Sequence, residues 1–148
     1  MASSPSTWLL LAYKVPREPS ANRVFVWRKL KKLGAIALQD AVWVLPASPH
    51  TREQFRWLAS EIDELSGETS LWESTLLSDG REDRLIQQFN GPVEQAYRGI
   101  LAALKKKTPD RAALGRQYQQ ALAQDYFRSA LGQKVRAALL AADGDTRA

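Results

Sequence analysis

The sequence predicts an α+β fold, and three observations support this prediction. Short apolar runs of strand length and two segments of helical periodicity follow one another in the order β, α, β, β, α, β. From residue 79 onward the pattern is helical only. A chain of 148 residues is long enough for one sizeable core but short for two. We therefore expect a ferredoxin-like antiparallel sheet over residues 1–78 and a helical extension over residues 79–148, packed on or beside it as one compact unit.

The first predicted strand is Trp8–Val15, an apolar run that ends before Pro16. The turn sequence PREPS follows, and Ser20 is a suitable N-cap for a helix from about Ala21 to Leu33. Gly34 is expected to end this helix, because glycine readily adopts the left-handed conformation of a helix C-terminus.

Two short apolar stretches come next, Ala35–Leu38 and Ala41–Leu45, on either side of Gln39 and Asp40. Apolar runs of this length around a short polar pair indicate a hairpin or a bulged pair of strands.

Thr51 is expected to cap a second helix, which Gly67 ends. Its apolar residues follow the spacing of one helical face: Phe55, Leu58, Ala59, Ile62 and Leu65. A last strand is predicted at Glu68–Leu77.

The C-terminal half predicts several helices. The sequence Asn90-Gly91-Pro92 is typical of the end of one helix and the start of the next. Asp110 begins a long helical pattern that reaches Leu139, with an interruption expected at Gly132.

Composition excludes several classes of function. The chain has no cysteine and one histidine, His50, so disulfides, thiolate nucleophiles and multi-histidine metal sites are ruled out. It has no apolar run of membrane-spanning length and no secretory signal pattern, so we expect a cytoplasmic protein that does not contact a membrane. A formal net charge of +5 favours anionic partners.

The first predicted helix is amphipathic and strongly basic. Helical spacing places Arg23, Val26, Trp27, Leu30 and Leu33 on one side, and Arg28, Lys29, Lys31 and Lys32 on the other. Phe25 falls among the lysines, where an aromatic ring can stack on a base while the cations bind phosphates. The alternatives are an ordinary solvated face, cover by the C-terminal helices, and a contact with a second copy of the chain.

Arg23 is unusual because it lies on the predicted apolar side, near the start of the helix. A buried guanidinium needs a partner, which Asp40 or Glu18 could supply, since an unpaired buried charge is strongly unfavourable. The alternatives are an arginine whose head reaches solvent and an arginine that binds an anion.

Trp57 and Trp72 lie off the apolar pattern of their elements. We expect the C-terminal helices to cover them, and a partner surface, such as a homodimer contact, is the alternative.

Catalysis is not expected. Of the carboxylates in the first half, Glu61, Asp63 and Glu64 lie on one exposed helical turn, and no phosphate-binding glycine loop is present. His50 lies in a predicted loop, and we interpret it as a surface or capping histidine. The small CRISPR-adaptation nucleases that use this fold place an aspartate at the end of the first strand, where this chain has Lys14. We expect no enzyme activity and no cofactor.

Three blocks of the sequence resemble one family. They are WLLLAYKVPREPSANRVFVWRKLKKLGAIALQDAVWVLP, TREQFRWLASEIDELSGETSLWES and DYFRSALGQKVRAALL. In order and spacing they resemble the N-terminal domain of the ChrB family of chromate-resistance regulatory proteins, over about residues 8–140. The first block also has a weaker likeness to the central domain of PaaX-type repressors.

This resemblance implies a DNA-linked regulator that responds to chromate or a similar oxyanion, with the operator of a chromate-resistance operon as its target and a homodimer as its expected state. The alternative is a structural or dimerisation domain without DNA contact. The relatives carry a further C-terminal domain, and if that domain senses the oxyanion, the present residues bind DNA or dimerise. The candidate DNA- or anion-binding residues are Arg17, Arg23, Arg28, Lys29, Lys31 and Lys32; the partner-surface candidates are Phe25, Trp57 and Trp72.

Overall fold

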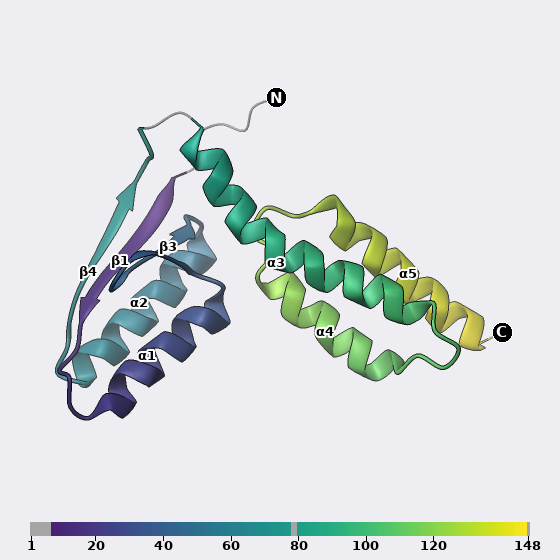
Figure 1. Cartoon of the computed structure of the whole chain (residues 1–148), viewed down its shortest axis with the longest axis horizontal. Helices are drawn as coiled ribbons and strands as arrows, with labels where there is room; N and C mark the ends of the chain where they lie inside the picture. The colour runs from purple at the N-terminus through teal and green to yellow at the C-terminus, as the bar shows by residue number, and fades with distance from the viewer. Residues whose placement is uncertain (1–6, 78–79, 148) are drawn as a thin grey trace. The chain divides into compact units, whose positions relative to one another are not determined.

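A computed structural model describes residues 7–77 and 80–147, with side chains through residue 142. The chain divides into two compact units, Met1–Asp83 and Arg84–Ala148 (Figure 1). The first unit contains a sheet with two helices, and the second is helical. The predicted packing of the helical extension on or beside the sheet stays a prediction.

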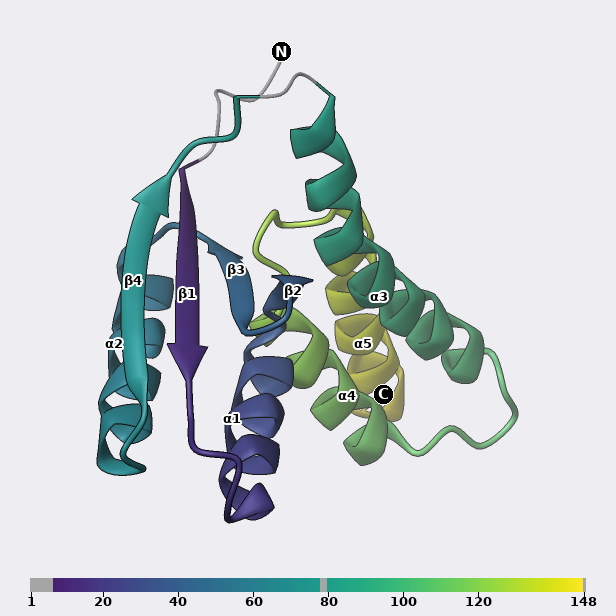
Figure 2. The ribbon, with the colours of Figure 1, turned by 60° about the vertical axis from the view of Figure 1, so that its left-hand side comes forward.

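The first unit has the predicted element order and a four-stranded antiparallel sheet, so the α+β prediction is confirmed. Its strands lie in the order β2-β3-β1-β4 (Figure 2). The elements along the chain are β1 (Trp8–Lys14), α1 (Ser20–Leu33), β2 (Ile36–Gln39), β3 (Val42–Pro46), α2 (Pro49–Glu64) and β4 (Glu68–Ser74). The register between β2 and β3 shifts between Ala37 and Gln39, which confirms the bulged pair. Strand β4 ends at Ser74, three residues before the predicted end at Leu77.

Both helices of this unit pack on one face of the sheet (Figure 2). Leu11 pairs with Trp43, and Leu9 pairs with Leu45, so these four side chains share a face. They are all buried, as are the residues that the helices direct toward them: Val26 and Leu30 of α1, and Phe55, Leu58 and Ile62 of α2. This shared apolar layer fixes the position of α1 and therefore of the charges on its outer surface.

The two ends of α1 differ from each other. Gly34 adopts a φ of 76°, and its N–H donates to the carbonyls of Leu30 and Lys31, which confirms the predicted C-terminal stop. The prediction of Ser20 as N-cap is wrong, because Ser20 is already helical and Pro19 holds the extended N-cap position. No side chain caps this end of the helix.

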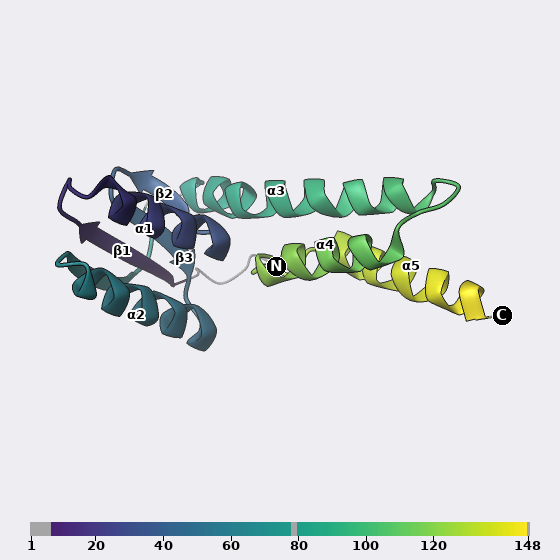
Figure 3. The ribbon, with the colours of Figure 1, turned by 90° about the horizontal axis from the view of Figure 1, so that it is seen from below.

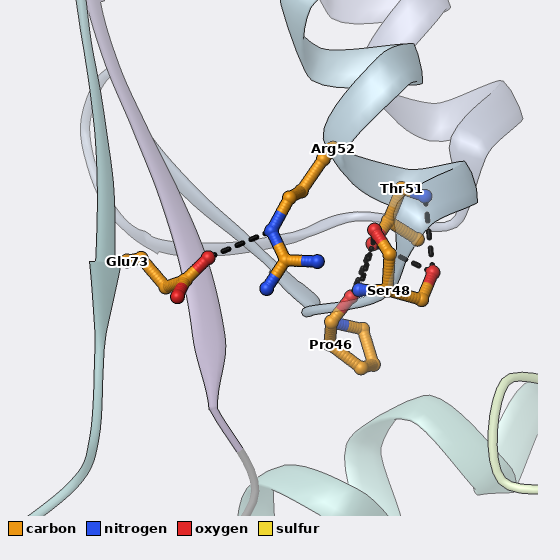
Figure 4. A network of polar contacts seen from close by, with 5 residues as sticks. All are labelled: Pro46, Ser48, Thr51, Arg52 and Glu73. Atoms are coloured by element: carbon orange, nitrogen blue, oxygen red, sulfur yellow. Dashed lines mark hydrogen bonds and ion pairs between the residues drawn. The ribbon is translucent and has the colours of Figure 1, made fainter.

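The start of α2 is held by a polar network around Thr51 (Figure 4). Ser48, not Thr51, is the N-cap, and Thr51 occupies the third helical position of a capping box. The Thr51 N–H donates to Ser48 Oγ at 3.1 Å, and the Ser48 N–H donates to Thr51 Oγ1 at 2.9 Å. Thr51 Oγ1 also donates to the carbonyl of Pro46 at 2.6 Å, which ties the helix to the end of β3. Beside this network Arg52 Nε donates to Glu73 Oε1 of β4 at 2.7 Å.

Replacing Thr51 by alanine is expected to lower the free energy of unfolding by about 1–3 kcal/mol, because it removes a buried hydroxyl that both accepts and donates. Thr51→Ser keeps the hydroxyl and should retain most of the stability. Urea unfolding followed by circular dichroism measures both variants, and equal losses in the two would contradict a role for the hydroxyl.

In the second unit, α3 (Arg81–Leu104) is one helix, so the predicted break at Asn90–Pro92 is wrong. Pro92 lacks the N–H that would bond the carbonyl of Gln88, and its ring crowds that carbonyl, which together cost about 3 kcal/mol or more inside a helix. The buried stripe of α3 continues across this point and outweighs this cost; it consists of Leu85, Phe89, Val93, Tyr97 and Ile100.

The long helical pattern after residue 110 forms two helices, α4 (Arg111–Ala123) and α5 (Ala130–Arg147). Asp110 caps α4 by accepting from the N–H of Ala113. The interruption lies before Ala130 and not at Gly132, which is within α5.

Helices α3, α4 and α5 pack around a common core (Figure 3). Tyr97 is fully buried in this core, and its hydroxyl donates to Asp125 Oδ2 at 2.9 Å. Burial and the neighbouring carboxylate of Asp125 raise the pKa of Tyr97 well above its ordinary value. A Cβ at Gly132 would lie 3.0 Å from the Tyr97 ring, so glycine lets α5 approach this pair closely.

Candidate anion-binding groove

One side of α1 lines an open groove of about 1010 Å³ in the first unit. Arg23, Trp27 and Lys31 form this wall, and their four-residue spacing places them on one stripe of the helix. The opposite wall comes from the end of β1 and from the β2–β3 hairpin, with Tyr13 and Trp43 among its residues. We call this the first groove.

The first groove is predominantly cationic. Four basic side chains line it, namely Lys14, Arg17, Arg23 and Lys31, and all four are exposed. Asp40 of the hairpin is the one acidic residue among its lining residues. The excess of positive charge makes the groove suitable for an anionic group such as a phosphate or an oxyanion.

Tyr13 and Trp43 form the aromatic part of the first groove. Burial raises the pKa of the Tyr13 hydroxyl, while the positive charge of Arg23 and a hydrogen bond with the Trp43 side chain act in the opposite direction. Tyr13 is therefore neutral at physiological pH, and its hydroxyl adds a polar group to the wall opposite α1.

The other side of α1 lines a separate groove of about 590 Å³, which we call the second groove. Its cations are Arg28, Lys29 and Lys32, and it contains Phe25. The ammonium of Lys29 lies 5.4 Å from the centroid of the Phe25 ring and 3.8 Å from Glu61 Oε2 of α2. Lys29 is therefore partly neutralised by an acid, but such an exposed pair is weak.

The structure thus divides the six predicted cations between two grooves. Arg17, Arg23 and Lys31 line the first groove, whereas Arg28, Lys29 and Lys32 line the second. Arg23 is exposed, which excludes the buried guanidinium and leaves the two alternatives of a guanidinium that reaches solvent and one that binds an anion. Sequence reasoning did not select Lys14, although its position at the end of β1, directly before the turn into α1, was a usable signal.

Trp27 was assigned to the core side of α1, and this prediction is wrong, because its side chain is 52% exposed. Val26 and Leu30 point at the sheet, and Trp27 lies a full 100° around the helix from Val26, beyond the edge of the contact. The short hairpin leaves an open groove at this place instead of covering the ring.

The three partner-surface candidates lie outside the first groove. Phe25 is 36% exposed, Trp57 on α2 is 64% exposed and Trp72 on β4 is 60% exposed. The indole N–H of Trp72 donates to Ser70 Oγ at 2.9 Å. The expectation that the C-terminal helices cover Trp57 and Trp72, and the alternative that these residues contact a partner, both stay predictions.

Two further features of the described part of the chain concern metals and membranes. Within residues 7–77 and 80–147, no three histidine, aspartate or glutamate side chains gather where they could hold a metal ion. No helix in the same ranges combines the length and apolar character needed to cross a membrane.

Comparison with known proteins gives a family match that begins within α1, at Arg23. Residues 23–127 match the family described as "Protein ChrB, N-terminal". Protein ChrB of Cupriavidus metallidurans is 33% identical over 97 residues, which are 65% of this chain and 30% of that protein. The chain therefore spans less than a third of the length of this relative. No solved structure matches the chain. Because the family match extends over more than two thirds of the chain, the chain belongs to the ChrB N-terminal family.

Proposed function

We propose that this chain is a regulatory module that binds DNA through the cations on the two sides of α1. The observation that carries the proposal is the exposure of all six predicted cations on or beside this one helix. Lysine and arginine side chains that neutralise phosphates supply most of the sequence-independent affinity for DNA. The proposal assigns the chain to the binding modules and not to the enzymes, and it places the chain in the cytoplasm.

Family membership supports a role in chromate resistance, in which chromate or a similar oxyanion changes the affinity for an operator. The four cations of the first groove offer one place for such an oxyanion. We also propose that the sheet of the first unit is ferredoxin-like, and its element order and strand order support this.

The distribution of charge favours an extended polyanion over a single small anion. The cations line two separate grooves of about 1010 and 590 Å³ on opposite sides of α1. A small oxyanion needs several donors that converge on one point, whereas a nucleic-acid backbone presents a row of charges that can reach both sides of a helix.

The test is the salt dependence of binding to duplex DNA, measured by fluorescence anisotropy with the DNA upstream of the protein's own operon and with an unrelated duplex. Each neutralised phosphate contributes about 0.9 to the slope of log K against log salt concentration, so contacts from four to six cations predict a slope of roughly −4 to −5. The same titrations with chromate, and with sulfate as the matched control, test the response to the oxyanion.

Three results would count against parts of this proposal. No binding to either duplex at low salt would remove DNA binding. A salt-independent affinity would remove the role of the α1 cations. Equal effects of chromate and sulfate would remove the specific response to chromate while leaving DNA binding in place.

The exposed tryptophans support a second candidate function, a dimerisation domain. Trp57 and Trp72 are each more than half exposed, and large exposed aromatic residues are enriched at protein interfaces. Sedimentation equilibrium tests this alternative: a dimer that dissociates in Trp57→Ala or Trp72→Ala would support it, and a monomer at high protein concentration would remove it.

A further inference from the structure

Trp27 is the feature of the first groove that phosphate binding does not explain. It is a large aromatic residue on α1 with about half of its side chain exposed, and the groove contains Tyr13 and Trp43 as well. An apolar ring that solvent reaches in a strongly cationic groove lacks the burial that usually stabilises a tryptophan. Duplex DNA offers phosphates to the groove but keeps its base faces stacked inside the helix.

The neighbours of Trp27 bring a stacking surface and phosphate-binding groups together. Arg23 lies one helical turn before Trp27 and Lys31 one turn after it, so the aromatic ring is flanked by a cation on each side along the helix. The Lys31 ammonium is 6.0 Å from the centroid of the Trp27 ring. An exposed contact of this kind is weaker than the stacking of a base on the same ring, and the flexible lysine can move to a phosphate.

The size and shape of the first groove fit a segment of a chain better than a single small molecule. Its volume of about 1010 Å³ is at the upper end of the range found for small-ligand pockets, and it is open along α1. A positive groove that contains exposed aromatic rings is the usual arrangement for single-stranded nucleic acid, in which bases stack on the rings and phosphates contact the cations.

We infer that the first groove binds an unpaired stretch of nucleic acid, with a base stacked on Trp27 and flanking phosphates on Arg23, Lys31 and Lys14. This inference rests on the proposed function and specifies the form of nucleic acid that the first groove accepts. Phe25 lines the second groove and not the first, so the inference concerns Trp27 and not Phe25.

The experiment compares labelled oligonucleotides in fluorescence anisotropy: a single strand, the duplex of the same sequence, and an abasic strand that keeps the sugar-phosphate backbone. Strands of DNA and of RNA distinguish the two sources of unpaired bases. The variants are Trp27→Ala, Trp27→Phe and, as a control at an exposed apolar residue outside both grooves, Leu122→Ala. Circular dichroism checks that each variant is folded.

Trp27→Ala is expected to weaken binding of the single strand by about 5- to 150-fold, the range that loss of one stacked base produces. Trp27→Phe should retain most of the affinity, and Leu122→Ala should change nothing. The affinity for the abasic strand should be the same in wild type and Trp27→Ala. The salt slope should also be unchanged in Trp27→Ala, because no charge is removed.

The outcomes separate this inference from the proposed function. If the wild type binds duplex DNA with a steep salt slope but Trp27→Ala leaves single-strand affinity unchanged, the inference fails and the proposed function stands. An equal loss of affinity for single, abasic and duplex strands in Trp27→Ala would also overturn the inference, since it would indicate disturbed packing of α1. If no nucleic acid binds at low salt, the proposed function and the inference fail together.

Discussion

Replacing both Arg23 and Lys31 by glutamate is expected to weaken DNA binding by more than about 100-fold at moderate salt. The two residues lie on one stripe of α1 and line the first groove, where Asp40 is the acidic residue already present. The double substitution removes two phosphate contacts and adds two repulsive charges, and the salt slope should become shallower by about 1.8. Both side chains are exposed, so the stability of the fold should change little.

The matched control is the double variant Arg28→Glu and Lys32→Glu, which makes the same change in net charge in the second groove. Anisotropy titrations of the two variants show which groove carries the affinity. Similar losses in the two variants are expected if the DNA backbone contacts both grooves, and wild-type affinity in the variant of the first groove would contradict its role.

Replacing Gly67 by alanine is expected to destabilise the first unit by about 3 kcal/mol or more. An added Cβ would lie 2.6 Å from Ile62 Cγ2, 2.6 Å from the carbonyl oxygen of Lys14 and 2.9 Å from Val15 Cγ1. The Lys14 carbonyl belongs to the backbone at the point where β1 pairs with β4, so it cannot move without disturbing that pairing.

Gly99→Ala is the control for the effect of glycine itself. Gly99 lies within α3, and no atom outside its own helical turn comes within 4 Å of an added Cβ. Alanine is the better helix former, so this variant should be more stable by up to about 1 kcal/mol. Thermal unfolding measures both variants, and a change below 1 kcal/mol in Gly67→Ala would contradict the close approach at that position.

Local patterns predicted the elements of the first unit because strand length, helical spacing and glycine geometry are local properties. Gly34 was correctly identified as the stop of α1, since its left-handed conformation depends only on its own backbone. The two helix starts were less predictable: Ser20, Ser48 and Thr51 are all residues of N-cap type, and which of them occupies the cap depends on how the preceding loop leaves the sheet.

The wrong predictions share a tertiary cause. Pro92 did not end α3, because burial of a continuous apolar stripe outweighed the missing hydrogen bond and the crowding of the proline ring. Trp27 was placed on the buried side, because helical periodicity gives the direction of a side chain but not the width of the surface that covers it. The six cations were identified from sequence as candidates for DNA or anion binding, but their division between two grooves depends on the hairpin beside one flank of α1.

The uncapped N-terminus of α1 affects the stability of this helix in the free protein. The helix has no acidic residue in its first turn, no side-chain cap, and like charges one turn apart at Arg28 and Lys32. Each such repulsion weakens a helix by a few tenths of a kcal/mol. A polyanion bound to α1 would reduce the repulsion between these neighbouring cations, so binding should raise the unfolding temperature of the protein. Without a polyanion, α1 is held in place mainly by its apolar contacts with the sheet and α2.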